Sequence, residues 1–132
     1  MQVTEQRFGN ALLLAVSGRL DRETADLFSA SLQPHLENCK TGGDVLLLDF
    51  ASVQYISSLG FQVLLRAQRM TKMQGGAFAV AALQGGAKSV FETANFAKVI
   101  RCHESVDNAL SEMSYSAYTV YKQQGAQGAQ GA

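Results

Sequence analysis

Two adjacent serines, Ser57 and Ser58, are the side chains of this sequence best placed to carry chemistry. They follow a short apolar run from 45 to 48, which is typical of a buried strand. They precede a segment from 61 to 70 that contains no glycine or proline and predicts a helix. A helix start carries unpaired N–H groups and a partial positive charge. A serine there is either a structural cap or a place to hold a phosphate.

The two hydroxyls differ in what their positions allow. Ser57 has the place of the helix N-cap, where a hydroxyl that accepts an N–H bond is worth about 1 kcal/mol. Ser58 then lies in the first turn with its hydroxyl near solvent. A phosphate on Ser58 would face free N–H groups and add about two negative charges. Ser58 is therefore either a regulatory phosphorylation site or an ordinary first-turn serine.

A catalytic serine would need a base beside it, and neither histidine is in an obvious position to act as one. His35 falls near the end of the first predicted helix, and His103 follows the last predicted strand. The sequence contains no Gly-rich phosphate loop and no Gly-x-Ser-x-Gly motif. Cys39 and Cys102 do not combine with the histidines at metal-ligand spacing. We therefore expect a protein that is not an enzyme and that uses no metal or cofactor.

Size and composition restrict the class of protein further. The chain has 132 residues, 47% of them hydrophobic and 17% charged, which fits one globular domain. Eleven basic and 11 acidic side chains leave no net charge, so bulk charge favours no nucleic-acid partner. No apolar run approaches the roughly 18 residues of a membrane span, and the N-terminus does not resemble a secretory signal. We expect a cytoplasmic protein without membrane insertion.

The pattern along the chain predicts an α/β domain that begins with an antiparallel hairpin. Strands at 3–7 and 11–17 flank a Gly-Asn turn. A helix follows, with Asp21 expected as its N-cap. Its inward face is expected to consist of Ala25, Phe28, Leu32 and Leu36.

The rest of the chain alternates strands and helices. Strands are expected at 44–49, 77–83 and 99–100, with a short helix at about 87–94 and a last helix from 104. The core face of the helix after Ser57 is expected to consist of Leu59, Val63, Ala67 and Met70, and that of the short helix to include Val90. The order predicts a mixed five-strand sheet with about four helices, which lie mainly on one side or wrap partly around it.

The C-terminal end changes in composition. Residues 122–132 form a Gln-Gly-Ala repeat without an apolar anchor, so we expect one domain over 1–121 and a flexible tail after it. Three tyrosines precede this tail, and they either cover the edge of the core or form an exposed patch: Tyr115, Tyr118 and Tyr121.

Two segments carry a resemblance to a known family. Gly18-Arg19-Leu20-Asp21 and the segment 53–60 resemble the STAS family of anti-sigma-factor antagonists, with support from 75–76, 91–96 and 99–100. The similarity extends over about residues 3 to 114. It implies a small bacterial partner switch. In that family the unphosphorylated protein binds an anti-sigma factor that is also a serine kinase, the kinase phosphorylates a serine at the start of the second helix, and a serine phosphatase reverses this step.

The family motif usually runs Asp-Ser-small-Gly. Aligned without gaps, it makes Ser58 the phosphoacceptor and Gly60 the glycine, while Ser57 replaces the aspartate and Leu59 replaces the small residue. The resemblance thus implies a partner-binding surface formed by Gly18, Asp21, Ser57, Ser58, Leu59 and Gly60. The alternative that it leaves open is a STAS subunit without a phosphorylation cycle, in a lipid ABC transporter or a signalling assembly. The sequence specifies no oligomeric state.

Overall fold

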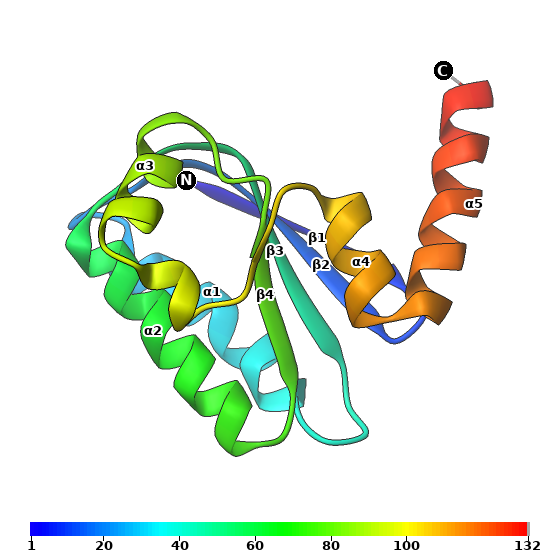
Figure 1. Cartoon of the computed structure of the whole chain (residues 1–132), viewed down its shortest axis with the longest axis horizontal. Helices are drawn as coiled ribbons and strands as arrows, with labels where there is room; N and C mark the ends of the chain where they lie inside the picture. The colour runs from blue at the N-terminus through cyan, green and yellow to red at the C-terminus, as the bar shows by residue number, and fades with distance from the viewer. Residues whose placement is uncertain (132) are drawn as a thin grey trace.

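A computed structural model describes the backbone of residues 1–131 and the side chains of residues 1–124. Its centre is a five-strand sheet in the order β1-β2-β3-β4-β5, with β1 antiparallel to β2 and the other neighbours parallel (Figure 1). The strands are β1 (Gln2–Phe8), β2 (Ala11–Leu20), β3 (Val45–Ile56), β4 (Ala77–Ala81) and β5 (Cys102–His103). The helices are α1 (Ala25–Asn38), α2 (Ser58–Met73), α3 (Gly85–Thr93), the 3-10 helix η1 (Phe96–Lys98), α4 (Val106–Met113) and α5 (Tyr115–Gly131). The predicted mixed five-strand α/β class is confirmed.

The opening hairpin forms at the predicted turn. Phe8 pairs with Ala11, so Gly9 and Asn10 are its two loop residues. Gly9 has a φ of +60°, which the tight hairpin turn requires and which glycine adopts without strain.

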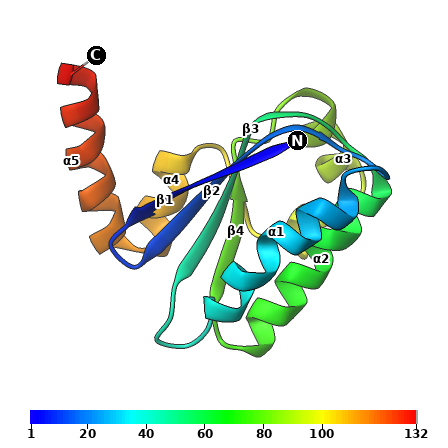
Figure 2. The same cartoon turned by 180° about the vertical axis from the view of Figure 1, so that it is seen from behind.

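Helices lie against both faces of the sheet, which agrees with the predicted alternative in which they wrap partly around it. Helices α1, α2 and α3 cover one face, and α4 with the start of α5 covers part of the other (Figures 1 and 2). The apolar run that opens β3 explains this, because its side chains alternate between the two sides. Leu46 and Leu48 belong to the core under α1 and α2, whereas Val45 and Leu47 belong to the core under α4.

The number of helices was predicted too low. The last predicted helix is two helices, α4 and α5, which are separated at Ser114. The Ser114 hydroxyl donates a hydrogen bond to Asn10 Oδ1 over 2.6 Å and accepts one from the N–H of Ala117 over 3.3 Å. These bonds fix a new helix start against the β1–β2 hairpin.

The three tyrosines divide between the two alternatives. Tyr118 and Tyr121 pack against the core under α4, and Tyr121 meets Phe8 edge to face with ring centroids 5.2 Å apart. Tyr115 is 72% exposed. The predicted domain end at residue 121 lies inside α5, and the side chains from 125 onward and Ala132 lie outside the described residues, so the flexible tail stays a prediction.

Two local predictions around α3 and the last strand were wrong. The strand expected at 99–100 forms at Cys102–His103 instead, because Phe96 O accepts the N–H groups of both Val99 and Ile100 and holds them in a turn. Helix α3 begins at Gly85, and Val90 is exposed, since Ala87 and Phe91 form its buried face.

Candidate functional site at the start of α2

Ser57 terminates β3 and caps α2. Its backbone is extended, with φ −88° and ψ 173°, and its hydroxyl accepts a hydrogen bond from Gly60 N over 3.4 Å. Its own N–H donates to Leu20 O over 2.8 Å, which ties the helix start to the end of β2. The N-cap role predicted for Ser57 is confirmed.

Ser58 is the first residue of α2, and its side chain is exposed. Leu59 is 37% exposed, so its predicted place on the core stripe is wrong. Gly60 faces the end of β2, and Leu59, about 100° around the helix from it, turns toward solvent. The buried face of α2 consists of Gly60, Phe61, Val63, Leu64, Ala67 and Thr71.

The segment before α1 lies beside this helix start, but Asp21 is not the N-cap of α1. That position belongs to Thr24, because α1 begins at Ala25. Asp21 Oδ1 instead accepts the N–H groups of Glu23 over 3.0 Å and Thr24 over 3.2 Å, and so closes the turn that precedes the helix. Desolvation pushes the pKa of Asp21 upward, but the two N–H groups, the Thr24 hydroxyl and nearby Arg19 together lower it below its ordinary value.

Arg19 connects the two segments. It pairs in register with Tyr55, and its guanidinium carbon lies 4.5 Å from the centroid of the Tyr55 ring. Its Nε is 3.7 Å from Asp21 Oδ2. The register between β2 and β3 is irregular after Gly18, whose φ is +98°, and this irregularity helps to aim the following side chains. Arg19 and Tyr55 lie within the two motif segments, 18–21 and 53–60, but no role was predicted for either residue.

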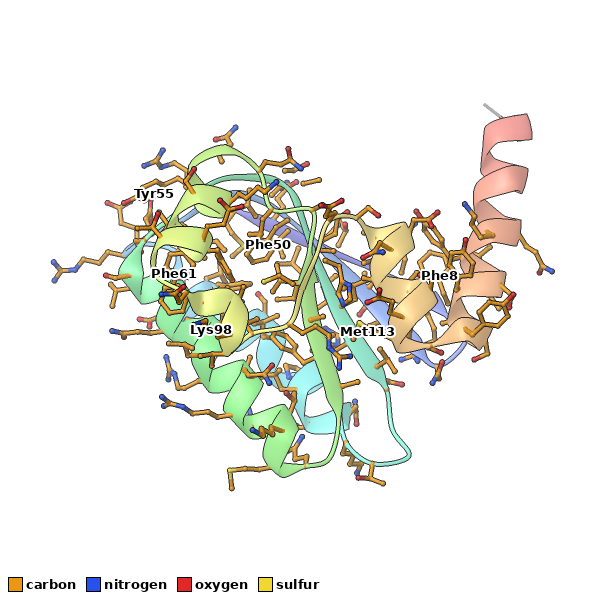
Figure 3. All side chains as sticks on the ribbon, viewed as in Figure 1. Phe8, Phe50, Tyr55, Phe61, Lys98 and Met113 are labelled. Atoms are coloured by element: carbon orange, nitrogen blue, oxygen red, sulfur yellow. The ribbon has the colours of Figure 1, made fainter. Side chains whose placement is uncertain are left out.

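A groove of about 550 Å³ runs along the exposed side of the helix start. Tyr55 and Phe61 lie together at this end of the molecule (Figure 3). Phe61 stacks on Phe96 with ring centroids 4.5 Å apart, which makes a rigid apolar floor. The lining residues are Tyr55, Ile56, Ser57, Ser58, Phe61, Gln62, Leu65, Val90 and Phe96. Exposed Tyr55, Leu59 and Val90 add apolar surface next to the Ser58 hydroxyl. The sequence offers no local signal for Tyr55, because the strand was expected to end at residue 49 and the exposure of the ring is known only from the structure.

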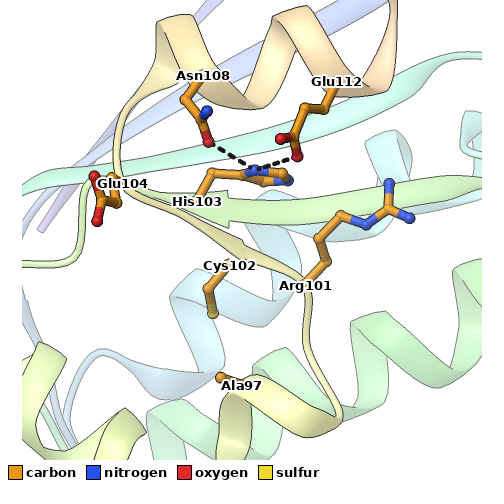
Figure 4. A pocket seen from close by; sticks show the side chains of 7 residues that line it. All are labelled: Ala97, Arg101, Cys102, His103, Glu104, Asn108 and Glu112. Carbon is orange, nitrogen blue, oxygen red and sulfur yellow. Dashed lines mark hydrogen bonds and ion pairs between the residues drawn. The ribbon is translucent and has the colours of Figure 1, made fainter.

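The histidines lie elsewhere. His103 is held under α4, with Nδ1 3.1 Å from Asn108 Oδ1 and 3.3 Å from Glu112 Oε2, in a separate cavity of about 590 Å³ (Figure 4). His35 Nε2 lies 3.5 Å from Glu5 Oε2. Neither imidazole lines the groove that contains Ser58. The geometry gives Ser58 no histidine base in the described part of the chain.

Both cysteines are free thiols, and Cys39 is buried. Burial raises the pKa of Cys102 to about 11, which keeps this thiol protonated at neutral pH. Within the side chains described, His, Cys, Asp and Glu form no group of three that could hold a metal ion. Across residues 1–131, every helix is too short or too polar to cross a lipid bilayer.

The fold is a β-hairpin followed by βα units, and the second helix begins with a pair of serines, the first of which is its N-cap. These features define a class of small α/β domains. The family model of the STAS domain matches residues 2–109, and the chain belongs to this family. Family members that act as anti-sigma-factor antagonists are generally not enzymes.

Three solved structures illustrate the similarity. The protein TM1081 of Thermotoga maritima is 19% identical, with a TM-score of 0.76 over 84% of this chain and 93% of that one. The phosphorylated Bacillus cell fate determinant SpoIIAA is 12% identical, with a TM-score of 0.61 over 83% and 97%. A sulfate transporter family protein of Wolinella succinogenes is 16% identical, with a TM-score of 0.64 over 86% and 89%. At these identities the likeness concerns the fold.

Proposed function

We propose that this chain is an anti-sigma-factor antagonist of the bacterial cytoplasm. It binds an anti-sigma factor that is also a serine kinase and thereby releases a sigma factor. Phosphorylation of Ser58 by that kinase ends the binding, and a serine phosphatase restores it. Membership of the STAS family and the likeness to SpoIIAA, which was solved in a phosphorylated form, support this function.

The observation that supports the proposal most directly is that the two serine hydroxyls have different environments. The Ser57 hydroxyl is occupied as the N-cap, whereas the Ser58 side chain is exposed on the first turn of α2. A kinase can reach Ser58 without unfolding the helix. The positive end of the helix dipole also stabilises a phosphate at this position.

The docking surface in this proposal consists of Gly18, Asp21, Ser57, Ser58, Leu59 and Gly60. Leu59 supplies exposed apolar area, and Ser58 stands next to it. The docking surface has two halves, the segment before α1 (Gly18 and Asp21) and the start of α2 (residues 57–60). Gly60 and Ser57 hold the start of α2 against Leu20, and this fixes the position of one half relative to the other. The adjoining groove gives a partner side chain an apolar place to insert.

Phosphorylation can act as a switch here for electrostatic reasons. The chain carries no net charge, so a phosphate changes the docking surface from nearly neutral to about two negative charges. A partner that buries this surface must then desolvate the phosphate or face it with its own acidic groups. Ser58→Asp, which supplies part of that charge, should weaken binding by about 1–3 kcal/mol.

The test is phosphorylation by the cognate anti-sigma factor kinase with ATP, followed by mapping of the phosphate by mass spectrometry. We expect phosphate on Ser58, its loss in Ser58→Ala, and its retention in Ser57→Ala. Calorimetry should show tight binding of the unphosphorylated protein and weakened binding of Ser58→Asp. Phosphate on another residue, or equal affinity for Ser58→Asp, would contradict the proposed switch.

One alternative remains specific enough to test, namely a STAS subunit without a phosphorylation cycle. The replacement of the family's aspartate by Ser57 and the transporter relative favour it. In that case the protein should co-purify from its native cell with a membrane transporter or a large signalling assembly rather than with a small ATP-binding kinase.

A further inference from the structure

Arg19 is an exposed cation whose hydrogen-bonding capacity is mostly unused among the described residues. Its side chain is 58% exposed, and its Nε lies 3.7 Å from Asp21 Oδ2, beyond hydrogen-bond distance. The guanidinium is instead supported on the Tyr55 ring, 4.5 Å from the centroid. A stacked guanidinium has a preferred direction but keeps its N–H donors free for an anion.

The Tyr55 ring connects Arg19 to the serine pair. Tyr55 lines the groove that also contains Ser57 and Ser58. Arg19 and Tyr55 are partners across β2 and β3, and one residue further on, Leu20 O accepts the N–H of Ser57. Arg19 is the penultimate residue of β2, and Ser58 follows the end of β3 by two residues. The Arg19 guanidinium lies on a ring that borders the groove containing Ser58.

Asp21 does not depend on Arg19 for its charge. Its Oδ1 already accepts the N–H groups of Glu23 and Thr24, and the Thr24 hydroxyl lies 3.3 Å from the same oxygen. A phosphate dianion, in contrast, presents three strong acceptor oxygens to which a guanidinium binds in a bidentate manner. An exchange of partners thus costs Asp21 little and offers Arg19 the stronger pair.

We propose that Arg19 is the internal receptor of a phosphate on Ser58: on phosphorylation its guanidinium leaves Asp21 and pairs with the phosphate oxygens. This inference rests on the proposed function, since it assumes that Ser58 is modified. It specifies how one modification alters both halves of the docking surface. As Ser58 gains its charge, the Asp21 carboxylate loses its neighbouring cation, so the segments before α1 and α2 both become more negative for an incoming partner.

The experiment uses the full chain with phosphoserine incorporated at position 58 during translation, so that no kinase is needed. The second ionisation of the phosphate, near pH 6 in ordinary phosphoserine, is followed by ³¹P NMR. An adjacent guanidinium lowers this pKa, so Arg19→Ala should raise it by about half a unit or more. Arg19→Lys keeps the charge but not the planar fork, and should give an intermediate value.

Arg66→Ala is the matched control. Arg66 is an exposed arginine of α2, the helix that begins at Ser58, and it lies about 12 Å from Ser58 along the helix axis. It should leave the titration unchanged. A second measurement needs no variant: the Arg19 Nε–H resonance should shift with the same midpoint as the phosphorus signal. The inference would be overturned by equal phosphate pKa values in Arg19→Ala and Arg66→Ala, or by an Arg19 Nε–H chemical shift that does not change as the phosphate ionises. Because the phosphate is installed without a kinase, such a result would not decide whether the kinase phosphorylates Ser58. The phosphorylation assay described above tests that question separately.

Discussion

Gly60, in the first turn of α2, lies directly against Leu20 at the end of β2. A Cβ on Gly60 would stand 3.0 Å from Leu20 O, 3.2 Å from Leu20 Cβ and 2.8 Å from Ile56 Cγ1. Real Cβ atoms essentially never show a contact as short as the one to Ile56 Cγ1, and the two contacts to Leu20 are tighter than nearly all real ones. The backbone oxygen of Leu20 belongs to a strand that cannot easily move. The helix start and the segment before α1 are adjacent because this position has no side chain.

Replacement of Gly60 by alanine should therefore destabilise the protein, although alanine is the better helix former. We expect a loss of about 1–3 kcal/mol from overpacking, measured by urea denaturation. Gly86 is the matched control, since it lies in the first turn of α3 with nothing within 4 Å of its virtual Cβ. Gly86→Ala should be neutral or stabilising by up to about 1 kcal/mol. Equal effects of the two changes would contradict the close approach at Gly60.

The two serines should separate in their effects on stability. Ser57→Ala removes the hydroxyl that accepts the Gly60 N–H, and should cost about 1 kcal/mol. Ser58→Ala removes an exposed hydroxyl, and should change the free energy of unfolding by less than about 0.5 kcal/mol. Chemical denaturation of both variants checks this. A larger loss for Ser58→Ala than for Ser57→Ala would reverse the roles assigned to the two hydroxyls.

Leu59 should matter for binding and not for folding. In the proposed complex its side chain is buried by the partner, so Leu59→Ser should weaken binding of the anti-sigma factor by about 1–2 kcal/mol. In the free protein Leu59 is already 37% exposed, and the midpoint of thermal unfolding should hardly change. Met73, at the other end of α2 and 87% exposed, provides the control. If Met73→Ser weakened binding as much as Leu59→Ser, the docking surface would lie elsewhere on α2.

Periodicity and local spacing predict some features of this fold and not others. The Gly-Asn hairpin turn, the buried run of β3 and the inward face of α1 each depend on a local pattern, and each was predicted correctly. Helix starts were predicted less well. Asp21 has the side chain of an N-cap, yet α1 begins four residues later, because Asp21 closes a preceding turn.

The remaining differences come from contacts between distant segments. Leu59 fits the apolar period of α2, but the contact between Gly60 and Leu20 fixes the rotation of the first turn and leaves Leu59 in solvent. The stacking of Arg19 on Tyr55 likewise depends on the parallel register of β2 and β3, which no local spacing reveals. The serine pair itself could be identified from the sequence, because strand, hydroxyls and helix are consecutive in the chain.

An ion pair at the opposite end of the sheet predicts how stability depends on pH. Arg7 donates from Nη1 to Asp44 Oδ1 over 2.9 Å and from Nη2 to Oδ2 over 3.0 Å, a bidentate pair that joins β1 to the start of β3. These hydrogen bonds hold the pKa of Asp44 below its ordinary value, although desolvation opposes them. A carboxyl whose pKa is lower in the folded state stabilises the fold above its unfolded pKa. That contribution is lost as the pH falls through the folded pKa.

Arg7→Gln should consequently reduce the free energy of unfolding at pH 7, and this difference from the unchanged protein should shrink as the pH falls through the folded pKa of Asp44. Because the Arg7 side chain is 53% exposed and screened by solvent, we expect at most about 1 kcal/mol at neutral pH, and less at high salt. Urea denaturation of both proteins between pH 7 and pH 2 measures the difference. Arg22→Gln is the control, since Arg22 is exposed and forms no ion pair among the described residues. If the Arg7 and Arg22 variants lost stability in parallel as the pH fell, the Arg7–Asp44 pair would not be the source of the pH dependence.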